Sequence, residues 1–134
     1  MTSRAFFDTN VVIYLLTADG TKADQSAELV RAGGLVSVQV LNECARVLRR
    51  KFGADWKRVS AASKSIRDAC DVVAVTEDVH IKGLAIAERY KLDVFDAMIV
   101  ATAVLSGCKT LYSEDMHEGL VIEGLTIRNP YAGG

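Results

Sequence analysis

The sequence contains few cysteines and a single proline. Its three cysteines, Cys44, Cys70 and Cys108, are an odd number and include no CxxC pair, so the sequence indicates neither a disulfide framework nor a structural zinc site. We expect buried, reduced thiols in a cytoplasmic protein. No Pro- or Ser-rich linker and no internal repeat divides the 134 residues, so we expect one domain over residues 1–134.

Long apolar runs are also lacking. The longest apolar-rich stretch, 97–105, includes Thr102 and is far shorter than a membrane span. Residues 1–8 contain no cationic leader followed by an apolar segment, so we expect no signal peptide. The formal net charge of −1 argues against a protein that coats nucleic acid passively, although basic patches can still form locally.

Short β-branched or aromatic runs alternate with longer helical patterns along the chain. This alternation is typical of βαβ units, and it predicts an α/β fold in which a central, mostly parallel sheet of four to five strands lies between two helical layers. Gly33, Gly34, Gly53 and Gly107 occur where predicted helices end. The predicted strands are 4–8, 35–38, 72–75, 109–113 and 125–128, and the predicted helices are 11–16, 23–32, 40–52, 56–69, 78–90 and 96–106.

Four acidic residues fall where such a sheet would bind a ligand, at the carboxyl ends of its strands. Asp8 closes the first predicted strand and Asp115 lies just past the fourth. Asp96 begins one predicted helix, and Glu43 lies near the start of another. We therefore expect the four side chains to meet at one edge of the sheet.

Each of these acids has a simpler explanation when it is taken alone. Asp8 and Asp96 could serve only as N-caps of the helices that follow them. Asp115 could occupy an ordinary turn. Glu43 lies between the apolar and basic faces of its predicted helix, so it could be a surface acid paired with Arg46 or Arg50.

Convergence of the acids would have an electrostatic consequence. Two carboxylates about 4 Å apart repel by roughly 4 kcal/mol at an effective dielectric constant near 20. A cluster would therefore take up protons, move apart or bind a cation. Hard oxygen ligands favour Mg²⁺ or Mn²⁺ over zinc, and the isolated His80 and His117 form no competing metal motif.

Four segments in order carry a resemblance to a known family: FDTN at 7–10, SVQVLNE at 37–43, FDAMIVATA at 95–103 and LYSEDM at 111–116, followed by IRNPY at 127–131. The sequence resembles PIN-domain proteins, in particular the VapC-type toxins of bacterial and archaeal toxin–antitoxin pairs. The resemblance covers nearly the whole chain and implies a single PIN domain over residues 1–134. No single segment is distinctive, but the four together at this spacing are specific.

The resemblance implies a metal-dependent endoribonuclease specific for single strands, using one or two Mg²⁺ or Mn²⁺ ions and leaving 3′-hydroxyl and 5′-phosphate ends. Two further acids lie nearby, Asp93 and Glu114, for which supporting or solvated roles are expected. The family's acidic positions, catalytic and metal-binding, are matched by Asp8, Glu43, Asp96 and Asp115, and its supporting positions by Thr9, Asn10 and Ser113.

Basic residues around the helix predicted at 40–52 are candidates for contacts with RNA phosphates. Arg46, Arg49 and Arg50 occupy the face opposite its apolar side, and Lys51, Lys57 and Arg58 follow. A solvated helix face is the alternative explanation. Trp56 could stack on a base, but we expect it to pack at a helix start.

The resemblance also implies two protein partners, a cognate antitoxin and a second copy of the chain in a homodimer. The predicted helices 11–16 and 23–32 are rich in apolar residues, which an antitoxin could cover. Simple packing into the core is the alternative for these residues.

Other functions remain open on the sequence alone. A PIN-type nuclease of housekeeping RNA processing would use the same acids. A Mg²⁺-dependent phosphatase or phosphoacceptor domain also places Asp after its first strand, but the haloacid-dehalogenase pattern needs a second Asp where this chain has Asn10. A non-catalytic binding module is disfavoured because none of the four acids is missing.

Overall fold

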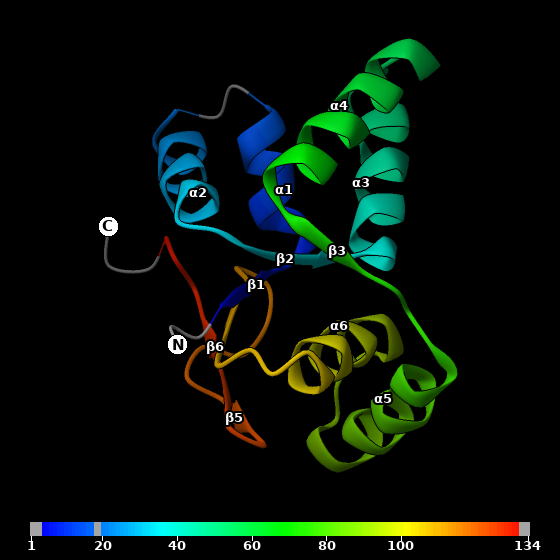
Figure 1. The fold of residues 1–134 in the computed structure, drawn as a ribbon, viewed down its shortest axis with the longest axis vertical. Coiled ribbons are helices and arrows are strands. Elements are labelled where there is room, and N and C mark those ends of the chain that lie inside the picture. The colour runs from blue at the N-terminus through cyan, green and yellow to red at the C-terminus, as the bar shows by residue number, and fades with distance from the viewer. Residues whose placement is uncertain (1–3, 18–19, 132–134) are drawn as a thin grey trace.

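The computed structural model of the protein describes residues 4–17 and 20–131. Each of the first three strands is followed by two helices, and the last three strands follow one another (Figure 1). The strands are β1 (Ala5–Phe7), β2 (Gly34–Ser37), β3 (Asp71–Val73), β4 (Thr110–Tyr112), β5 (Val121–Ile122) and β6 (Leu125–Arg128). The helices are α1 (Thr9–Leu16), α2 (Thr21–Arg31), α3 (Val38–Arg50), α4 (Trp56–Ala69), α5 (Glu77–Tyr90) and α6 (Val94–Leu105).

The strands form one sheet in the order β3-β2-β1-β4-β6-β5. All neighbours are parallel except β5 and β6, whose register pairs Val121 with Thr126 and Ile122 with Leu125. The prediction of four to five strands was therefore wrong, because β5 was not expected. Glu123 and Gly124, both with positive φ (48° and 87°), form the two-residue turn between β5 and β6.

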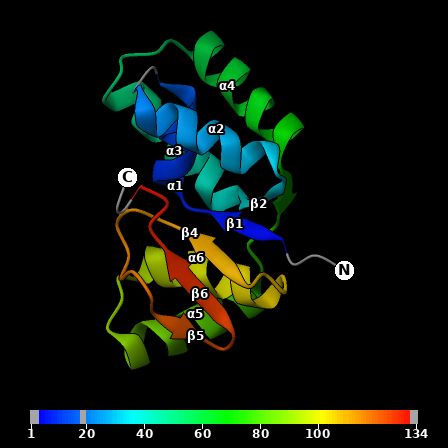
Figure 2. The ribbon, with the colours of Figure 1, turned by 90° about the vertical axis from the view of Figure 1, so that its left-hand side faces the viewer.

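Two helical layers enclose this sheet, which confirms the predicted α/β/α arrangement. Figure 2 shows α1 to α4 on one face and α5 with α6 on the other. All six predicted helices are present in the described ranges, with boundaries that differ by up to two residues at either end. The largest functional consequence is at α6, which begins at Val94 with Asp93 as its N-cap, so an N-cap role for Asp96 is wrong.

The core forms where both helical layers meet the sheet. Phe6, Phe7 and Leu111 are fully buried in the central strands, and burial of each such side chain contributes about 1.5–3 kcal/mol. Seven consecutive residues of α6, from Ala97 to Ala103, are buried, since this helix lies between the sheet and α5. This explains why its sequence is apolar on every side.

The apolar residues of the early helices belong to this core. Val11, Val12 and Val30 are buried, and Leu15 and Leu29 pack against the buried cluster. Core packing therefore accounts for these side chains. Within residues 4–17 and 20–131, no helix is both long and apolar enough to cross a membrane.

The three cysteines are buried and free, as the sequence predicts. Burial raises the pKa of Cys44 to about 12 and that of Cys70 to about 11. Because the thiolate is the reactive form, these thiols are chemically inert at neutral pH.

The strand order creates a point where the sheet changes its direction of winding. β1 and β4 are neighbours, but the helices that follow β1 and those that precede β4 cover opposite faces of the sheet. Helices diverging in this way leave a crevice beyond the carboxyl ends of the two strands, which is where open α/β sheets bind ligands.

Candidate active site

The four predicted acids border one cavity of about 390 Å³ in this crevice. Asp8 follows β1, Asp115 lies beyond β4, Asp96 is in the first turn of α6, and Glu43 is on α3. Elements separated by a hundred residues thus bring the acids together, as the sequence predicts. The remaining wall residues of this acidic cavity are Thr9, Asn10, Ile13, Tyr14, Val47, Lys51 and Glu114.

Asp8 is the most constrained of the acids. It is 4% exposed and caps α1 by accepting a 2.7 Å hydrogen bond from the Thr9 backbone N–H. Its Oδ2 atom accepts hydrogen bonds from the Ser113 hydroxyl (2.7 Å) and the Asn10 amide (3.3 Å). The cap role considered from the sequence is therefore real, but it is one of several contacts of this side chain.

Burial raises the pKa of Asp8 to about 6. The negative charges of Glu43 and Asp115 raise it further, while the hydrogen bonds from Ser113 and Thr9 oppose the rise. The carboxylate is thus held in place by donors but destabilised as an anion by its surroundings. A cation in the cavity would relieve that cost.

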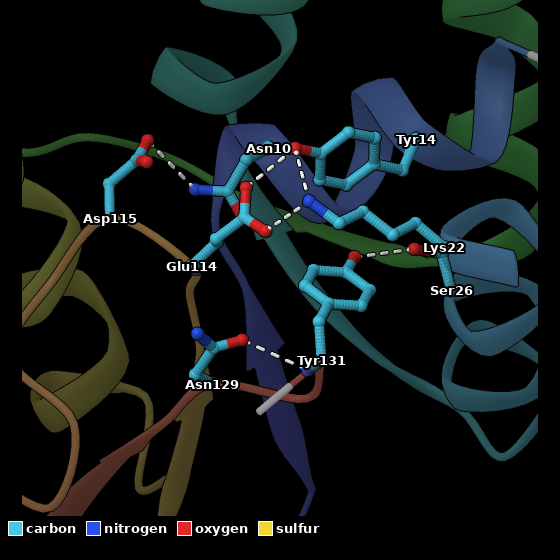
Figure 3. Close-up of polar contacts among 8 residues, drawn as sticks. All are labelled: Asn10, Tyr14, Lys22, Ser26, Glu114, Asp115, Asn129 and Tyr131. Carbon is cyan, nitrogen blue, oxygen red and sulfur yellow. Dashed lines mark hydrogen bonds and ion pairs between the residues drawn. The ribbon is translucent and has the colours of Figure 1, made fainter. Parts of the chain in front are cut away.

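Asn10 connects Asp8 to the loop after β4. Its amide nitrogen donates to Asp8 and also to Asp115 Oδ2 at 3.1 Å, and its Oδ1 accepts from the backbone N–H of Glu114 at 3.1 Å (Figure 3). A single side chain therefore sets the spacing between two of the acids. These contacts would allow Asn10 to support the two acids, which is the role that the resemblance implies for it.

Glu43 is held by a glutamine rather than by an arginine. The Gln39 amide donates to Glu43 Oε2 (3.0 Å) and to the Phe95 carbonyl (2.9 Å), which joins α3 to the start of α6. In the described part of the chain Glu43 forms no ion pair with the neighbouring arginines, so the alternative of a surface salt bridge is wrong. Burial, followed by the charge of Asp96, raises the pKa of Glu43.

Asp96 lies half-buried in the first turn of α6. Burial raises its pKa to about 6, and the charges of Asp8, Asp93 and Asp115 act in the same direction. Asp93 itself is exposed and caps α6 by accepting from the Phe95 N–H at 3.0 Å. This cap accounts for the position of Asp93, and the expectation that it is not a principal ligand stays a prediction.

The chemistry of the donors fits a hard divalent cation, although the side chains do not form a closed coordination shell. Over residues 4–17 and 20–131, no three His, Cys, Asp or Glu side chains are grouped closely enough to hold a metal ion. Mutual repulsion keeps uncompensated carboxylates apart, so they would draw together around an ion. Four oxygen donors on one cavity are a donor set that suits Mg²⁺ or Mn²⁺.

The Thr9 hydroxyl also fits a cavity that holds a polar ligand. Its Oγ1 atom is buried and has no hydrogen-bond partner among the described residues. It lies near enough to Glu43 to lower the pKa of that carboxyl, but the pair does not have the geometry of a hydrogen bond. A buried hydroxyl without a partner beside four acids marks a place where a hydrated ion or a substrate would complete its bonding.

Sequence reasoning missed a second polar network, which anchors the loop carrying Asp115. Glu114 accepts hydrogen bonds from Tyr14 Oη (2.5 Å) and Lys22 Nζ (2.6 Å), so the loop after β4 is tied to α1 and α2 (Figure 3). Lys22 lowers the pKa of Glu114, and Glu114 in turn raises the pKa of Lys22. Lys22 and Glu114 are 92 positions apart, and no local pattern marks either as a partner.

The carboxyl-terminal segment closes over this network. The Tyr131 ring packs edge-on against Tyr14 with their centroids 5.2 Å apart, and its hydroxyl lies 2.6 Å from Ser26 Oγ. Lys22 Nζ lies 4.7 Å from the centre of the Tyr14 ring. Figure 3 shows the Lys22 side chain between the two tyrosine rings, with its amine directed at Glu114.

The predicted basic residues line the exposed side of α3. Arg46, Arg49 and Arg50 are exposed, and all three border further cavities next to the acidic one. Trp56 is the first residue of α4 and packs against the Arg49 guanidinium, as predicted for a helix start, although its side chain remains 66% exposed. Their contact with RNA stays a prediction.

Comparison with known proteins agrees with this geometry. The PIN-domain family model matches residues 5–117, a span that includes all four acids. The chain belongs to the PIN-domain family. A search of curated protein sequences found no significant match.

Solved structures share the PIN fold of this chain at low sequence identity. A toxin–antitoxin complex from Klebsiella pneumoniae superimposes with a TM-score of 0.73 and 23% identity, covering 95% of this chain and 98% of its own. The VapC20 toxin of Mycobacterium tuberculosis, which cleaves the sarcin–ricin loop, gives 0.69 and 24%, covering 83% and 89%. DNA-bound VapBC from Salmonella typhimurium gives 0.71 and 17%, covering 96% and 99%. These similarities confirm the predicted fold.

Proposed function

We propose that this PIN domain is a metal-dependent endoribonuclease and the toxin of a VapBC-type toxin–antitoxin pair. The observation that carries the proposal is the convergence of Asp8, Glu43, Asp96 and Asp115 on one cavity at the carboxyl edge of the sheet. VapC and toxin–antitoxin structures with the same fold support the toxin assignment. We assign Asp8, Glu43, Asp96 and Asp115 as the residues that hold one or two Mg²⁺ or Mn²⁺ ions.

The chain's own contacts would orient these ligands. Three donors fix the Asp8 carboxylate, which we place at the centre of the site, and Asn10 fixes Asp115 relative to it. Gln39 directs Glu43 toward the cavity. Glu43 and Asp96 would complete the site or position the attacking water, and Asp115 would act at its outer side. Preorganised carboxylates reduce the reorganisation needed when a phosphodiester enters.

When bound, the divalent ion would orient the scissile phosphate, lower the pKa of a water molecule and offset the negative charge that develops during in-line attack. Lys51, on the cavity wall, would help to neutralise the incoming phosphate. The products expected from such attack carry 3′-hydroxyl and 5′-phosphate ends.

The proposal includes two protein partners. A cognate antitoxin would block the cavity, and a second copy of the chain would form a homodimer. Solved structures with the same fold include a toxin–antitoxin complex and a VapBC complex, which supports the antitoxin. Co-purification of the chain with the product of a small neighbouring gene, followed by size measurement of the complex and of the free chain, tests both.

The central experiment compares wild type with Asp8→Asn on purified cellular RNA. We expect cleavage that requires Mg²⁺ or Mn²⁺, stops in EDTA, and falls by more than about 100-fold in Asp8→Asn. Sequencing the new 5′-phosphate ends identifies the RNA that is cut. Asp68→Asn is the matched control, because Asp68 is exposed and, among the described residues, forms an ion pair only with Lys64 on α4. Cleavage by Asp8→Asn at the wild-type rate, or unchanged cleavage in EDTA, would contradict the proposal of a metal-dependent nuclease.

A toxin and a housekeeping nuclease differ in their effect on the cell. Induced expression of wild type should arrest growth, whereas Asp8→Asn at the same protein level should not. Co-expression of the antitoxin should restore growth. Normal growth with active enzyme present would favour RNA processing over toxicity.

A further inference from the structure

Three cavities follow one another along the exposed face of α3. The acidic cavity shares Glu43, Val47 and Lys51 with a second cavity of about 280 Å³. That second cavity shares Arg46 and Arg50 with a third of about 470 Å³. Because neighbouring cavities share wall residues, they lie side by side along α3, and we call the three together the α3 groove. Its far end is lined by Ala45, Arg46, Arg49, Arg50 and Trp56.

The spacing of residues on α3 explains how this helix contributes side chains to both the core and the α3 groove. Val40, Cys44 and Leu48 recur every four residues and are buried on the inner face of α3. Arg46 and Arg50, also four apart, therefore share an outer face. At a rise of 1.5 Å per residue, Glu43 and Arg50 are separated by about 10 Å along the helix axis.

The positive charge on the walls of the second and third cavities is not neutralised by the described part of the protein. In the described ranges, Arg46, Arg50 and Lys51 form no ion pair, and Glu43 is the only acid on the walls of the second and third cavities. The whole chain has a net charge of −1, so this positive charge is a local feature. Such a stripe attracts a polyanion through phosphate contacts and counterion release.

Trp56 ends the groove with an aromatic surface. Its side chain is 66% exposed and contributes little to the core. The guanidinium of Arg49 lies over the indole, with Cζ 4.4 Å from the ring centroid, and donates a 3.0 Å hydrogen bond to the Ala54 carbonyl. Arg49 thus holds the indole in place, while the ring remains accessible to solvent. Aromatic and guanidinium planes of this kind are what unpaired bases stack on.

We propose that a single strand of RNA runs from the acidic cavity along the α3 groove, with phosphates at Arg46 and Arg50 and a base stacked at Trp56. The identity of the polyanion rests on the proposed nuclease function, because the acidic cavity is one end of the α3 groove. The Trp56–Arg49 pair adds base stacking, which an acidic polypeptide does not require. The groove therefore selects unpaired nucleotides beyond the cleaved bond.

Trp56 is the only tryptophan of the chain, so its fluorescence reports directly on this site. The experiment uses Asp8→Asn in EDTA, where binding is observed without cleavage. Oligouridylate of about ten nucleotides, a length suited to one ssRNA-binding groove, should quench the fluorescence. Inorganic polyphosphate supplies negative charge without bases and should bind with much less quenching.

Substitutions then separate stacking from charge, with affinity measured by the anisotropy of labelled oligouridylate. Trp56→Ala should weaken binding by about 5- to 150-fold, and Trp56→Phe should restore part of the loss. Arg46→Gln and Arg50→Gln should each make the negative slope of log affinity against log salt less steep by about 0.7. Arg67→Gln is the matched control, since it removes an exposed arginine of α4 that borders none of the three cavities.

Each result decides the inference. Wild-type affinity in Trp56→Ala, or salt slopes in Arg46→Gln and Arg50→Gln equal to that of Arg67→Gln, would overturn it. Tight binding of polyglutamate with no binding of oligouridylate would also overturn it, in favour of a protein partner. Because binding is measured without cleavage, the two proposals can fail separately. If the chain binds RNA through Trp56 but cuts no RNA, the path along the α3 groove is supported and the nuclease function is not. If cleavage requires metal but is unaffected by Trp56→Ala, Arg46→Gln and Arg50→Gln, the nuclease function is supported and the proposed path of the RNA along the α3 groove is wrong.

Discussion

The hydroxyl of Ser113 donates a 2.7 Å hydrogen bond to Asp8 Oδ2, although the two residues are 105 positions apart. Both are buried, and they follow the neighbouring parallel strands β4 and β1. The backbone N–H of Asp8 also donates to the Tyr112 carbonyl, so register and side-chain contact reinforce each other. The central acid of the site is therefore positioned by the pairing of two strands.

Ser113→Ala should weaken both the fold and the site. Ser113 donates to Asp8 and accepts from the Met116 N–H at 3.3 Å, so its removal leaves buried groups without a partner. We expect the free energy of unfolding to fall by about 1–3 kcal/mol in urea titrations. The lost hydrogen bond also opposed the rise in the pKa of Asp8, so the acid limb of the cleavage–pH profile should move to higher pH.

Ser65→Ala is the control for this change. Ser65 is an exposed serine of α4, and its removal should alter the free energy of unfolding by less than about 0.5 kcal/mol. Equal stability of Ser113→Ala and Ser65→Ala would contradict the role assigned to the Ser113 hydroxyl.

Metal-free Asp8→Asn should be more stable than metal-free wild type at pH 7.5. Folding raises the pKa of Asp8 from 3.8 to about 6, which corresponds to about 3 kcal/mol. With a raised pKa, the stabilising contribution of the protonated group is complete below pH 3.8 and is lost as the pH rises through about 6. The asparagine carries no charge to desolvate, so it avoids this loss.

Thermal melts in EDTA at pH 4 and pH 7.5 measure the effect. The advantage of Asp8→Asn should be present at pH 7.5 and absent at pH 4, and added Mg²⁺ should raise the melting temperature of wild type more than that of the variant. A variant that is less stable than wild type at pH 7.5 in EDTA would show that burial does not destabilise the Asp8 anion.

The sequence contained enough information to predict the layers of the fold and the four acids. Helix patterns are local, since apolar residues recur every three or four positions, and all six helices were found on that basis. Strand β5 was missed because two residues are too few to show alternation. Its local signal was Glu123-Gly124 between Ile122 and Leu125, a turn that the positive φ of both residues reveals in the structure.

Contacts between distant segments could not be predicted in the same way. Asp115 was expected near Asp8, but the bridging amide of Asn10 depends on which strands are neighbours. Gln39 was not singled out, because its two hydrogen bonds join helices that are distant in the sequence. Trp56 was expected to pack at a helix start, but the sequence did not indicate that its partner is the Arg49 guanidinium or that the ring stays largely exposed.

Lys22 and Glu114 should act as one unit in positioning Asp115. Glu114→Gln removes the charge that Lys22 and Tyr14 hold, and Lys22→Met removes the cation while keeping the length of the chain. Each should loosen the loop that carries Asp115, so the Mg²⁺ concentration needed for half-maximal cleavage should rise by several-fold. Because the two residues contact each other, the double variant should lose less than the product of the two single effects.

A remote ion pair provides the comparison for this cycle. Lys64→Met and Asp68→Asn break an exposed pair one turn apart on α4 and should leave the metal requirement unchanged. If the Lys22 and Glu114 effects simply multiply, or if only RNA affinity changes, the residues do not position the metal site.

Gly34→Ala should destabilise the protein and disturb the site through β1. Gly34 pairs with Ala5 in the sheet, and a Cβ atom there would lie 2.7 Å from Phe7 Cζ and 2.8 Å from the Ala5 carbonyl oxygen. Neither a packed ring nor a strand backbone can move aside cheaply, so we expect a loss of about 1–3 kcal/mol or more in the free energy of unfolding. Phe7 directly precedes Asp8, so displacement of its ring should also reduce cleavage.

Gly83→Ala is the matched substitution on α5. Its Cβ would meet the thioether end of Met98, which can turn to another rotamer, and alanine favours the helix over glycine by about 1 kcal/mol. The two effects oppose each other, so this variant should stay within about 1 kcal/mol of wild type and keep its activity. Urea unfolding and cleavage rates measured on both variants test the difference. Equal losses in the free energy of unfolding from the two substitutions would show that the close contacts of Gly34 with Phe7 and Ala5 are not the cause of its effect.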